Sequence, residues 1–230
     1  EIYTLSLHDA LPISIHESHG FEITVLCEEP RASYDRVQLT SFFSGKSAAD
    51  LALAPLDFFT RHGIDVRYCE TTIAIDRQAK QVTTSSGRRF AYDHLVLATG
   101  SSPFVPPIPG RDRRHCFVYR TIEDLQAIRA AASTAKIGTV VGGGLLGLEA
   151  AKALTDLGLQ THVVEFAPRL MAVQVDDLGG RVLRQKIAAL GGKTHARALE
   201  VQARAHDLLG LLHALVPFGE IGRALEQVEP

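Results

Sequence analysis

The amino-acid sequence predicts an α/β fold built from two parallel βαβ units, both incomplete, with a small antiparallel insertion. Three observations predict it. An apolar strand over residues 139–141 runs through three glycines into a helix. A second apolar run, 21–26, ends in acidic residues, and three short β-runs separated by polar turns follow it. Strands that alternate with helices favour a parallel sheet, whereas short runs joined by tight turns favour an antiparallel one.

The beginning of the chain has no periodic pattern. Residues 1–14 show neither the alternation of a strand nor the apolar stripe of a helix. They look like a peptide translated from sequencing-adapter DNA, so we expect an artefactual or disordered tail that takes no part in the fold. A natural, loosely packed N-terminus is the alternative.

The first unit covers residues 15–120. Its strand over 21–26 is followed by Glu28 and Glu29, as expected for the second strand of a dinucleotide-binding unit. Residues 15–20 cannot supply the strand and glycine loop that precede it in such a unit, so we expect the sequence to begin within the unit. The later elements are, in order, an amphipathic segment over 50–62 ended by Gly63, a strand over 64–68, β-runs over 71–76, 81–85 and 89–92, and a strand over 94–100 that suits burial on both faces.

A proline-rich link over 102–110, which suits neither a helix nor a central strand, leads towards the second unit over 121–192. This unit opens with a helix. Thr121 is the expected N-cap, and Asp124 stands three residues later in the position of the capping-box acid. The elements expected after it are a strand over 139–141, a helix over 148–157 closed by Gly158, a strand over 161–164 and a helix over 176–189.

The last segment, 193–230, has an atypical composition. Beyond Gly191, Arg, His, Ala and Leu recur with weak helical periodicity, and no further strand is expected. A natural helical tail and a change of reading frame near Gly192 are two interpretations of equal weight.

The glycine loop of the second unit carries the strongest functional signal. Gly142, Gly144 and Gly147 fill the pattern G-x-G-x-x-G, in which the glycines permit a tight turn, a close approach of the backbone to a diphosphate, and close packing of helix on strand. The N-terminus of the following helix offers unpaired N–H groups to that diphosphate. The predicted loop consists of Gly142, Gly143, Gly144, Leu145, Leu146 and Gly147.

An acid follows the next strand. Glu165 lies about twenty residues beyond the glycines, where a carboxylate accepts hydrogen bonds from an adenosine ribose. Because a carboxylate repels a 2′-phosphate, NAD is favoured over NADP, although Arg169 lies near enough in sequence to contact a phosphate. The alternative is an ordinary glycine-rich turn with a solvated Glu165; the agreement of strand, loop, helix and acid favours the nucleotide.

Composition excludes several function classes. The 230 residues carry a formal net charge of −2, which gives no basis for nucleic-acid binding. No apolar run is long enough to span a membrane. Cys27, Cys69 and Cys116 form no metal-binding or redox spacing, so we expect reduced thiols in a cytoplasmic protein. The scattered histidines suggest no metal site.

Several segments together resemble the flavoproteins that contain two dinucleotide-binding domains and pass electrons from NAD(P)H to FAD. Within that family they are most similar to the large subunits of NADH-dependent assimilatory nitrite reductases. The similarity covers roughly residues 20–192, and its motifs occur in the right order. The segments that carry it are 27–31, 34–37, 95–100, 116–125, 142–151 and 163–171.

The resemblance implies roles for individual residues. It places Glu29 at the adenosine ribose of FAD, with Glu28 as the alternative, and Arg36 close to the FAD diphosphate or ribose. Glu149 faces the nicotinamide and the flavin; a surface glutamate in the first turns of its helix is the alternative. The segment that passes tightly beside the flavin nucleotide is Ala98, Thr99 and Gly100.

The implied function is that of a fragment of a nitrite reductase, the part that carries electrons from NADH to FAD. The resemblance implies that sirohaem and a [4Fe-4S] cluster, which act on nitrite, are held by a region absent from this sequence, and that a small subunit is a partner. It implies no side chain of this sequence as a catalytic acid, base or metal ligand. A stand-alone NAD(P)H-dependent reductase of rubredoxin, ferredoxin or nitrate reductase is an alternative, as is an inactive NAD-binding fragment. Two departures stand out. The FAD glycine loop is absent, so we do not expect this fragment alone to hold the flavin diphosphate in the usual way or to be active. The lysine of many ferredoxin-type relatives is replaced around Ser41.

Overall fold

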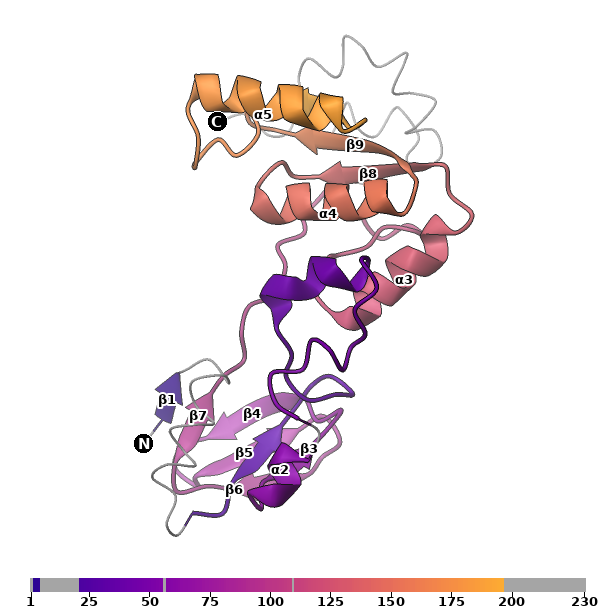
Figure 1. Ribbon diagram of the computed structural model, residues 1–230. Helices are drawn as coiled ribbons and strands as arrows, with labels where there is room; N and C mark the ends of the chain where they lie inside the picture. The colour runs from indigo at the N-terminus through magenta and orange to yellow at the C-terminus, as the bar shows by residue number, and fades with distance from the viewer. Residues whose placement is uncertain (1, 5–20, 56, 109, 197–230) are drawn as a thin grey trace. The chain divides into compact units, whose positions relative to one another are not determined.

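The computed structural model describes residues 2–4, 21–55, 57–108 and 110–196. The chain divides into two compact units, the first formed by residues 1–36 and 47–102, and the second by residues 37–46 and 103–230. The first unit combines parallel strands with a short helix, and the second combines a parallel sheet with longer helices, which confirms the predicted α/β class (Figure 1).

The first unit contains two parallel strand pairs and an antiparallel meander. β2 (Thr24–Leu26) pairs with β3 (Asp65–Arg67), and β1 (Ile2–Thr4) pairs with β7 (Leu95–Leu97). The remainder of the 1–14 segment, for which we expected an artefactual or disordered tail, lies outside the described residues. Three consecutive antiparallel strands form the predicted insertion, namely β4 (Thr72–Asp76), β5 (Gln81–Thr84) and β6 (Arg89–Ala91).

The core of the first unit lies beneath β2 and β3. Phe59 and Ile64 are buried there, and Ile23, Val25 and Val66 pack against them. Phe59 belongs to α2 (Phe58–Arg61), a single turn, whereas the sequence suggested an amphipathic segment over 50–62. Pro55 explains the shorter helix, because its ring prevents the preceding residues from continuing a helical hydrogen-bond ladder into α2.

The strand expected over 94–100 forms as β7, but the prediction that it is buried on both faces is wrong. Leu95, Val96 and Leu97 are each only half-buried. Among the described strands, β7 pairs only with β1. The described part of the chain therefore covers the apolar side chains of β7 only in part.

A buried acid organises the meander. Glu70 is 5% exposed, accepts a hydrogen bond from Ser86 (2.8 Å), and pairs with Arg88 at 3.0 Å. Hydrogen bonds from the hydroxyls of Thr84 and Ser86, with a smaller contribution from Arg88, lower the pKa of Glu70 below its ordinary value. The carboxylate therefore stabilises the turns of the meander when it is ionised.

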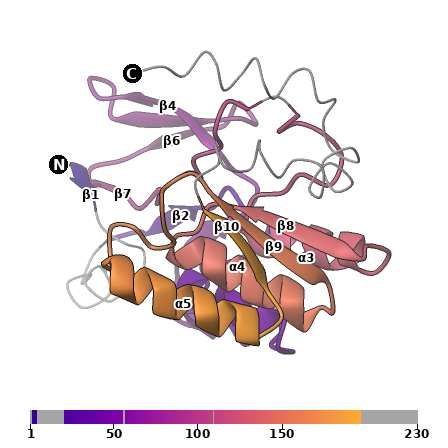
Figure 2. The ribbon, with the colours of Figure 1, turned by 90° about the horizontal axis from the view of Figure 1, so that it is seen from above.

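The second unit contains a three-stranded parallel sheet in the order β10-β9-β8. α4 and α5 lie together against the sheet (Figure 2), as in one mononucleotide-binding half of a Rossmann fold. Its elements are β8 (Ile137–Val141), α4 (Leu145–Asp156), β9 (Gln160–Glu165), α5 (Asp177–Ala189) and β10 (Lys193–Ala196). Ala151, Val163 and Leu170 form its buried centre.

β10 corrects the expectation that no strand follows Gly191. Lys193 to Ala196 pair in parallel with His162 to Glu165, and the imidazoles of His162 and His195 lie 3.1 Å apart, Nδ1 to Nε2. The strand was missed because four residues with one apolar side chain give no periodic signal. Most of the 193–230 tail, including the region of a possible change of frame, lies outside the described residues.

α3 (Ile122–Ala132) holds the segment 37–46 within the second unit. Its N-terminus has the predicted capping box between Thr121 and Asp124, and Ile122 and Leu125 are fully buried. Arg129 donates from Nη2 to the carbonyl oxygen of Phe42 (2.5 Å), and its guanidinium lies 4.2 Å above the Phe42 ring. These contacts fix the 3₁₀ helix η1 (Arg36–Phe42), which lines the groove described below.

Candidate dinucleotide site

The glycine loop turns sharply where β8 ends. Gly142 has φ of +113°, a conformation that favours glycine, and its N–H donates to the carbonyl oxygen of Val164 at 2.8 Å. Gly144 occupies the N-cap position of α4, and Leu148 N–H makes an early helical bond to the Gly144 carbonyl oxygen (3.0 Å). No side chain caps α4, and uncapped amides at a helix N-terminus suit an anion; the binding of a diphosphate there stays a prediction.

Gly147 and Gly144 differ in the space around them. A Cβ on Gly147 would lie 2.0 Å from the Gly142 carbonyl oxygen, so the helix can approach the loop only without a side chain at that position. A Cβ on Gly144 would meet nothing within 4 Å. Gly147 is thus required for the close packing of helix on loop, whereas Gly144 borders open space.

Glu165 reaches back to the loop. Its Oε2 accepts a hydrogen bond from the Gly143 N–H (2.6 Å), and its Oε1 accepts one from the Ala167 N–H (2.7 Å). Gly143 is also held by Met171, whose N–H donates to the Gly143 carbonyl oxygen (2.9 Å). The carboxylate is therefore fixed beside the glycine loop by backbone groups, and each oxygen retains a lone pair for a ribose hydroxyl.

Arg169 has a structural position. Its Nε donates to the Val175 carbonyl oxygen (2.9 Å), its Nη2 to that of Ala172 (3.2 Å), and its Nη1 pairs with Asp177 (3.0 Å). All three partners belong to the loop before α5 or to the first turn of α5. The guanidinium thus stabilises this loop. To contact a phosphate, as the sequence suggested, Arg169 would have to give up some of these hydrogen bonds.

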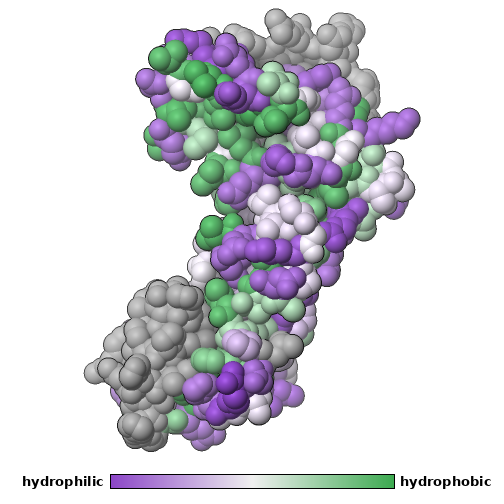
Figure 3. Space-filling view, in the orientation of Figure 1, coloured by the Kyte–Doolittle hydropathy of each residue, from purple (hydrophilic) through white to green (hydrophobic). Residues whose placement is uncertain are grey.

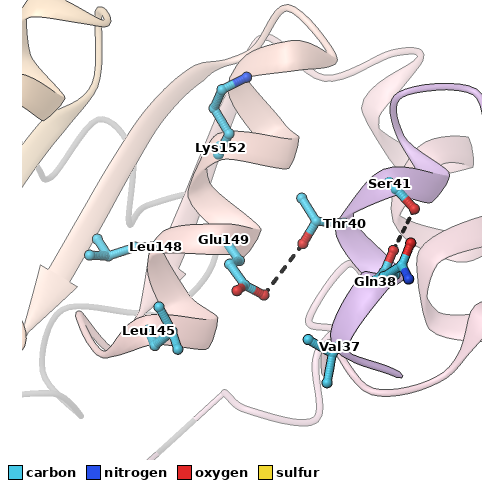
Figure 4. A pocket seen from close by; sticks show the side chains of 8 residues that line it. All are labelled: Val37, Gln38, Thr40, Ser41, Leu145, Leu148, Glu149 and Lys152. Atoms are coloured by element: carbon cyan, nitrogen blue, oxygen red, sulfur yellow. Dashed lines mark hydrogen bonds between the residues drawn. The ribbon is translucent and has the colours of Figure 1, made fainter. Parts of the chain in front are cut away.

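A groove of about 500 Å³ lies between η1 and α4 within the second unit (Figure 4). Glu149 on α4 points across it towards Thr40 on η1, and the Thr40 hydroxyl lies 3.4 Å from Glu149 Oε2. The groove combines apolar walls with hydroxyl, amide and carboxylate groups, which suits a planar ring with a polar substituent. It is lined by Val37, Gln38, Thr40, Ser41, Leu145, Leu148, Glu149 and Lys152.

Tyr119 stands behind Thr40. The phenol donates to Thr40 Oγ1 at 3.2 Å, and its ring stacks on Phe43 with centroids 6.2 Å apart. Burial, together with the nearby charge of Glu149, raises the pKa of Tyr119, so the phenol is protonated and a donor at neutral pH. The sequence did not mark Thr40 or Tyr119 as site residues. Thr40 and Glu149 are 109 positions apart, so no local spacing could show their contact.

In the first unit, Glu29 lies among polar side chains. Its Oε2 accepts from the Tyr34 hydroxyl at 2.6 Å, and its Oε1 pairs with Arg36. Burial acts to lower the pKa of Arg36, but the hydrogen bond to Glu29 and the charges of Tyr34 and Glu29 raise it above its usual value. Glu28 is exposed. Of the two candidate acids, Glu29 is thus the one that forms an ion pair with Arg36.

The remaining predicted residues follow β7. Ala98 is half-buried, whereas Thr99 and Gly100 are exposed. Gly100 has φ of +67°, so the chain makes a bend there that favours glycine. Their contact with a flavin nucleotide stays a prediction.

Apolar side chains surround the end of the sheet in the second unit. Val141, Leu145, Leu146 and Phe166 are all more than half exposed. Figure 3 shows apolar surface over α5 and near the N-terminal end of α4. Beside the polar loop amides and Glu165, such side chains can cover the apolar faces of a bound nucleotide.

Residues 12–210 match the family described as pyridine nucleotide-disulphide oxidoreductase. The chain belongs to this family. Membership supports an oxidoreductase with flavin and nicotinamide nucleotides as cofactors. The predicted fold, two Rossmann-like dinucleotide-binding units, agrees with it.

The chain is similar to large subunits of nitrite reductases. It is 57% identical over 175 residues to the nitrite reductase [NAD(P)H] large subunit of Klebsiella oxytoca, covering 76% of this chain and 18% of that protein. It is 55% identical over 179 residues to the nitrite reductase (NADH) large subunit of Escherichia coli K12, covering 78% and 21%. The chain thus spans about one fifth of these relatives, and the resemblance inferred from the motifs is confirmed.

A solved structure gives the same fold. The crystal structure of NADH:rubredoxin oxidoreductase from Clostridium acetobutylicum matches with a TM-score of 0.76 at 26% identity. The match covers 86% of this chain and 52% of that one. Among the residues that our structure describes, no helix is both long and apolar enough to cross a membrane.

Proposed function

We propose that the second unit binds NADH and that the chain is the part of a nitrite reductase that carries electrons from NADH to FAD. The observation that carries the proposal is the glycine loop with its uncapped helix and the adjoining carboxylate of Glu165. In the bound state NADH supplies a hydride and the flavin accepts it.

The chain's own residues bind and orient. The amides at the start of α4 bind the diphosphate, and Glu165 accepts hydrogen bonds from the adenosine ribose, which favours NADH over NADPH. Glu149 orients the nicotinamide carboxamide from the groove. Glu29 and Arg36 hold the adenosine ribose and the diphosphate side of FAD. The contribution to the rate is the positioning of the two cofactors, with no side chain acting as acid or base.

In this proposal, nitrite is reduced to ammonia by a part of the protein outside these 230 residues, which would hold the sirohaem and the [4Fe-4S] cluster. A small subunit would be a separate partner. The relatives are named as large subunits of nitrite reductases and are much longer than this chain, which supports nitrite reduction and a second subunit outside these residues. The sirohaem and the cluster rest on the family resemblance alone. We further propose a cytoplasmic location and partners that include neither nucleic acid nor a membrane.

The test is to incubate the purified chain with FAD, remove free flavin and add NADH without oxygen. The proposal predicts that the chain binds NADH, and that any FAD it retains without the FAD glycine loop is bleached by NADH. A chain that keeps FAD but is not bleached, or one that does not bind NADH, would contradict the proposal; a chain that binds NADH but no FAD would support the alternative of an inactive NAD-binding fragment.

A second candidate is a stand-alone reductase of a small electron carrier. The structural similarity to NADH:rubredoxin oxidoreductase favours it. Rapid NADH-dependent reduction of added rubredoxin or ferredoxin by the flavin-loaded chain would favour this candidate over a nitrite reductase.

A further inference from the structure

The groove contains a chain of hydrogen bonds that ends on Glu149. The Tyr119 hydroxyl lies 3.2 Å from Thr40 Oγ1, and Thr40 Oγ1 lies 3.4 Å from Glu149 Oε2. The second bond is long, as is common in sites that tighten when the ligand binds. All three residues belong to the second unit.

The donors and acceptors in this series of hydrogen bonds follow from the chemistry of the three side chains. A threonine hydroxyl has one proton, and an ionised carboxylate can only accept. Because Tyr119 donates its proton to Thr40, the Thr40 proton remains for Glu149. Tyr119 is itself held by stacking on Phe43, and Arg129 fixes the neighbouring Phe42.

Among the described residues, no cation pairs with the Glu149 carboxylate in the groove. Lys152 lines the same groove one helical turn away, but its ammonium pairs with both oxygens of Asp156, at 2.5 and 2.6 Å. Ser41 instead donates to the Gln38 carbonyl oxygen at 2.6 Å. The Glu149 carboxylate thus accepts a hydrogen bond from a neutral hydroxyl at Oε2, and both its oxygens have further lone pairs for a ligand in the groove.

We propose that Thr40 and Tyr119 are positioning residues that orient Glu149 to select a ligand with a primary carboxamide on a planar ring. A fixed anionic acceptor binds the carboxamide N–H₂ and disfavours a ring that bears a carboxylate or a ligand without the ring. This inference rests on the proposed function, because the carboxamide ligand it selects is the nicotinamide of NADH.

The test compares NADH with ADP-ribose, which shares the adenosine and diphosphate but lacks the nicotinamide ring. Both ligands are titrated calorimetrically into the whole chain and into Thr40→Val, Thr40→Ser and Tyr119→Phe. Ser44→Ala, an exposed change on the same segment, is the control. The expected loss of preference for NADH in Thr40→Val is about three- to tenfold, the effect of one hydrogen bond.

The inference predicts that ADP-ribose binds all variants equally, and that Thr40→Ser and Ser44→Ala retain the preference for NADH. It also predicts a smaller loss in Tyr119→Phe, and no further loss when Thr40→Val is added to Glu149→Gln. An unchanged preference in Thr40→Val and Tyr119→Phe, with normal ADP-ribose binding, would overturn the inference and leave the proposed function standing. Failure of the unaltered chain to bind either ligand would overturn both.

Discussion

Two acids near the ends of strands in this chain, Glu165 as the last residue of β9 and Glu29 shortly after β2, are held in different ways. Glu165 in the second unit accepts hydrogen bonds from two backbone N–H groups, of Gly143 and Ala167. Glu29 in the first unit is held by two side chains, Tyr34 and Arg36. The same sequence signature therefore gives one carboxylate fixed by the backbone of a glycine loop and one fixed by an ion pair at a partly exposed site.

The comparison teaches where each carboxylate is vulnerable. Backbone donors cannot be removed by changing their own side chain, so Glu165 depends on the shape of the loop. The Arg36 side chain is 36% exposed, so its pairing with Glu29 is screened by salt and contributes little to stability. The binding geometry of the second unit should thus respond to changes at glycines.

The largest expected effect is at Gly147. Gly147→Ala places a Cβ 2.0 Å from the Gly142 carbonyl oxygen, so the loop or helix must shift. We expect a loss of stability on the order of 2–3 kcal/mol, measured by urea denaturation. The control is Gly144→Ala, whose Cβ meets open space and whose substitution at an N-cap costs about 1 kcal/mol or less. Gly144→Ala should instead weaken NADH binding tenfold or more, and equal stability losses in the two variants would contradict this division of roles.

The second prediction concerns the cofactor that Glu165 selects. Glu165→Arg removes an acceptor for the ribose hydroxyls and adds a charge that attracts a 2′-phosphate. We expect the ratio of NADPH to NADH affinity to rise about 10- to 100-fold, as for one or two hydrogen bonds to a charged group. Calorimetric titration with both nucleotides measures it, with the exposed Asp112→Arg as a control for net charge. An unchanged ratio would remove Glu165 from the ribose site.

The third prediction is that the two units lose stability in different pH ranges. Burial, with the neighbouring His195 and Lys193, lowers the pKa of His162 below its ordinary 6.5, so the folded second unit resists a proton that the unfolded chain accepts. Its stabilising effect is complete above pH 6.5 and declines as the pH falls. Glu70 in the first unit also has a lowered pKa, so its contribution is present above about pH 4.5 and is lost only as the pH falls further.

Denaturation at a series of pH values measures both effects. His162→Gln should reduce the loss of stability between pH 7 and pH 5.5, whereas Glu70→Gln should reduce only the loss below pH 4.5. If Glu70→Gln alters the higher range as much as His162→Gln does, the assignment of the two pH ranges is wrong.

The smallest effect is expected at the N-terminus. Deleting residues 1–14 removes β1, which pairs three residues with β7. If the segment is artefactual, as proposed from its sequence, the melting temperature should change by less than about 2 °C. A clear drop would show that this segment belongs to the folded first unit.

Local features of the chain were predictable. The capping box of Thr121 and Asp124, and the bend at Gly142, depend on residues within a few positions of one another, and the structure has both. The antiparallel meander was also found, because short strands and tight turns leave a local pattern.

Contacts between distant residues were not predictable. The groove joins Thr40 with Glu149 and Tyr119, which no spacing rule connects. β10 was missed because so short a strand is stabilised by pairing with its neighbour, here β9, and leaves no pattern in its own sequence. Arg169 lies near enough in sequence to contact a phosphate, and that contact stays a prediction. Its hydrogen bonds to the loop before α5 and to Asp177 depend on tertiary packing, which the sequence does not show.

The central claim is that the loop at the start of α4 binds the diphosphate of NADH. The most direct measurement is to follow the backbone amide NMR resonances of residues 142–147 while NADH is added to the chain and to Gly144→Val. We predict that the amides of Gly143 to Gly147 shift the most and saturate with NADH, and that these shifts disappear in Gly144→Val while the remaining spectrum keeps its folded pattern. Binding of NADH that leaves these amides unchanged and shifts other residues would contradict the account.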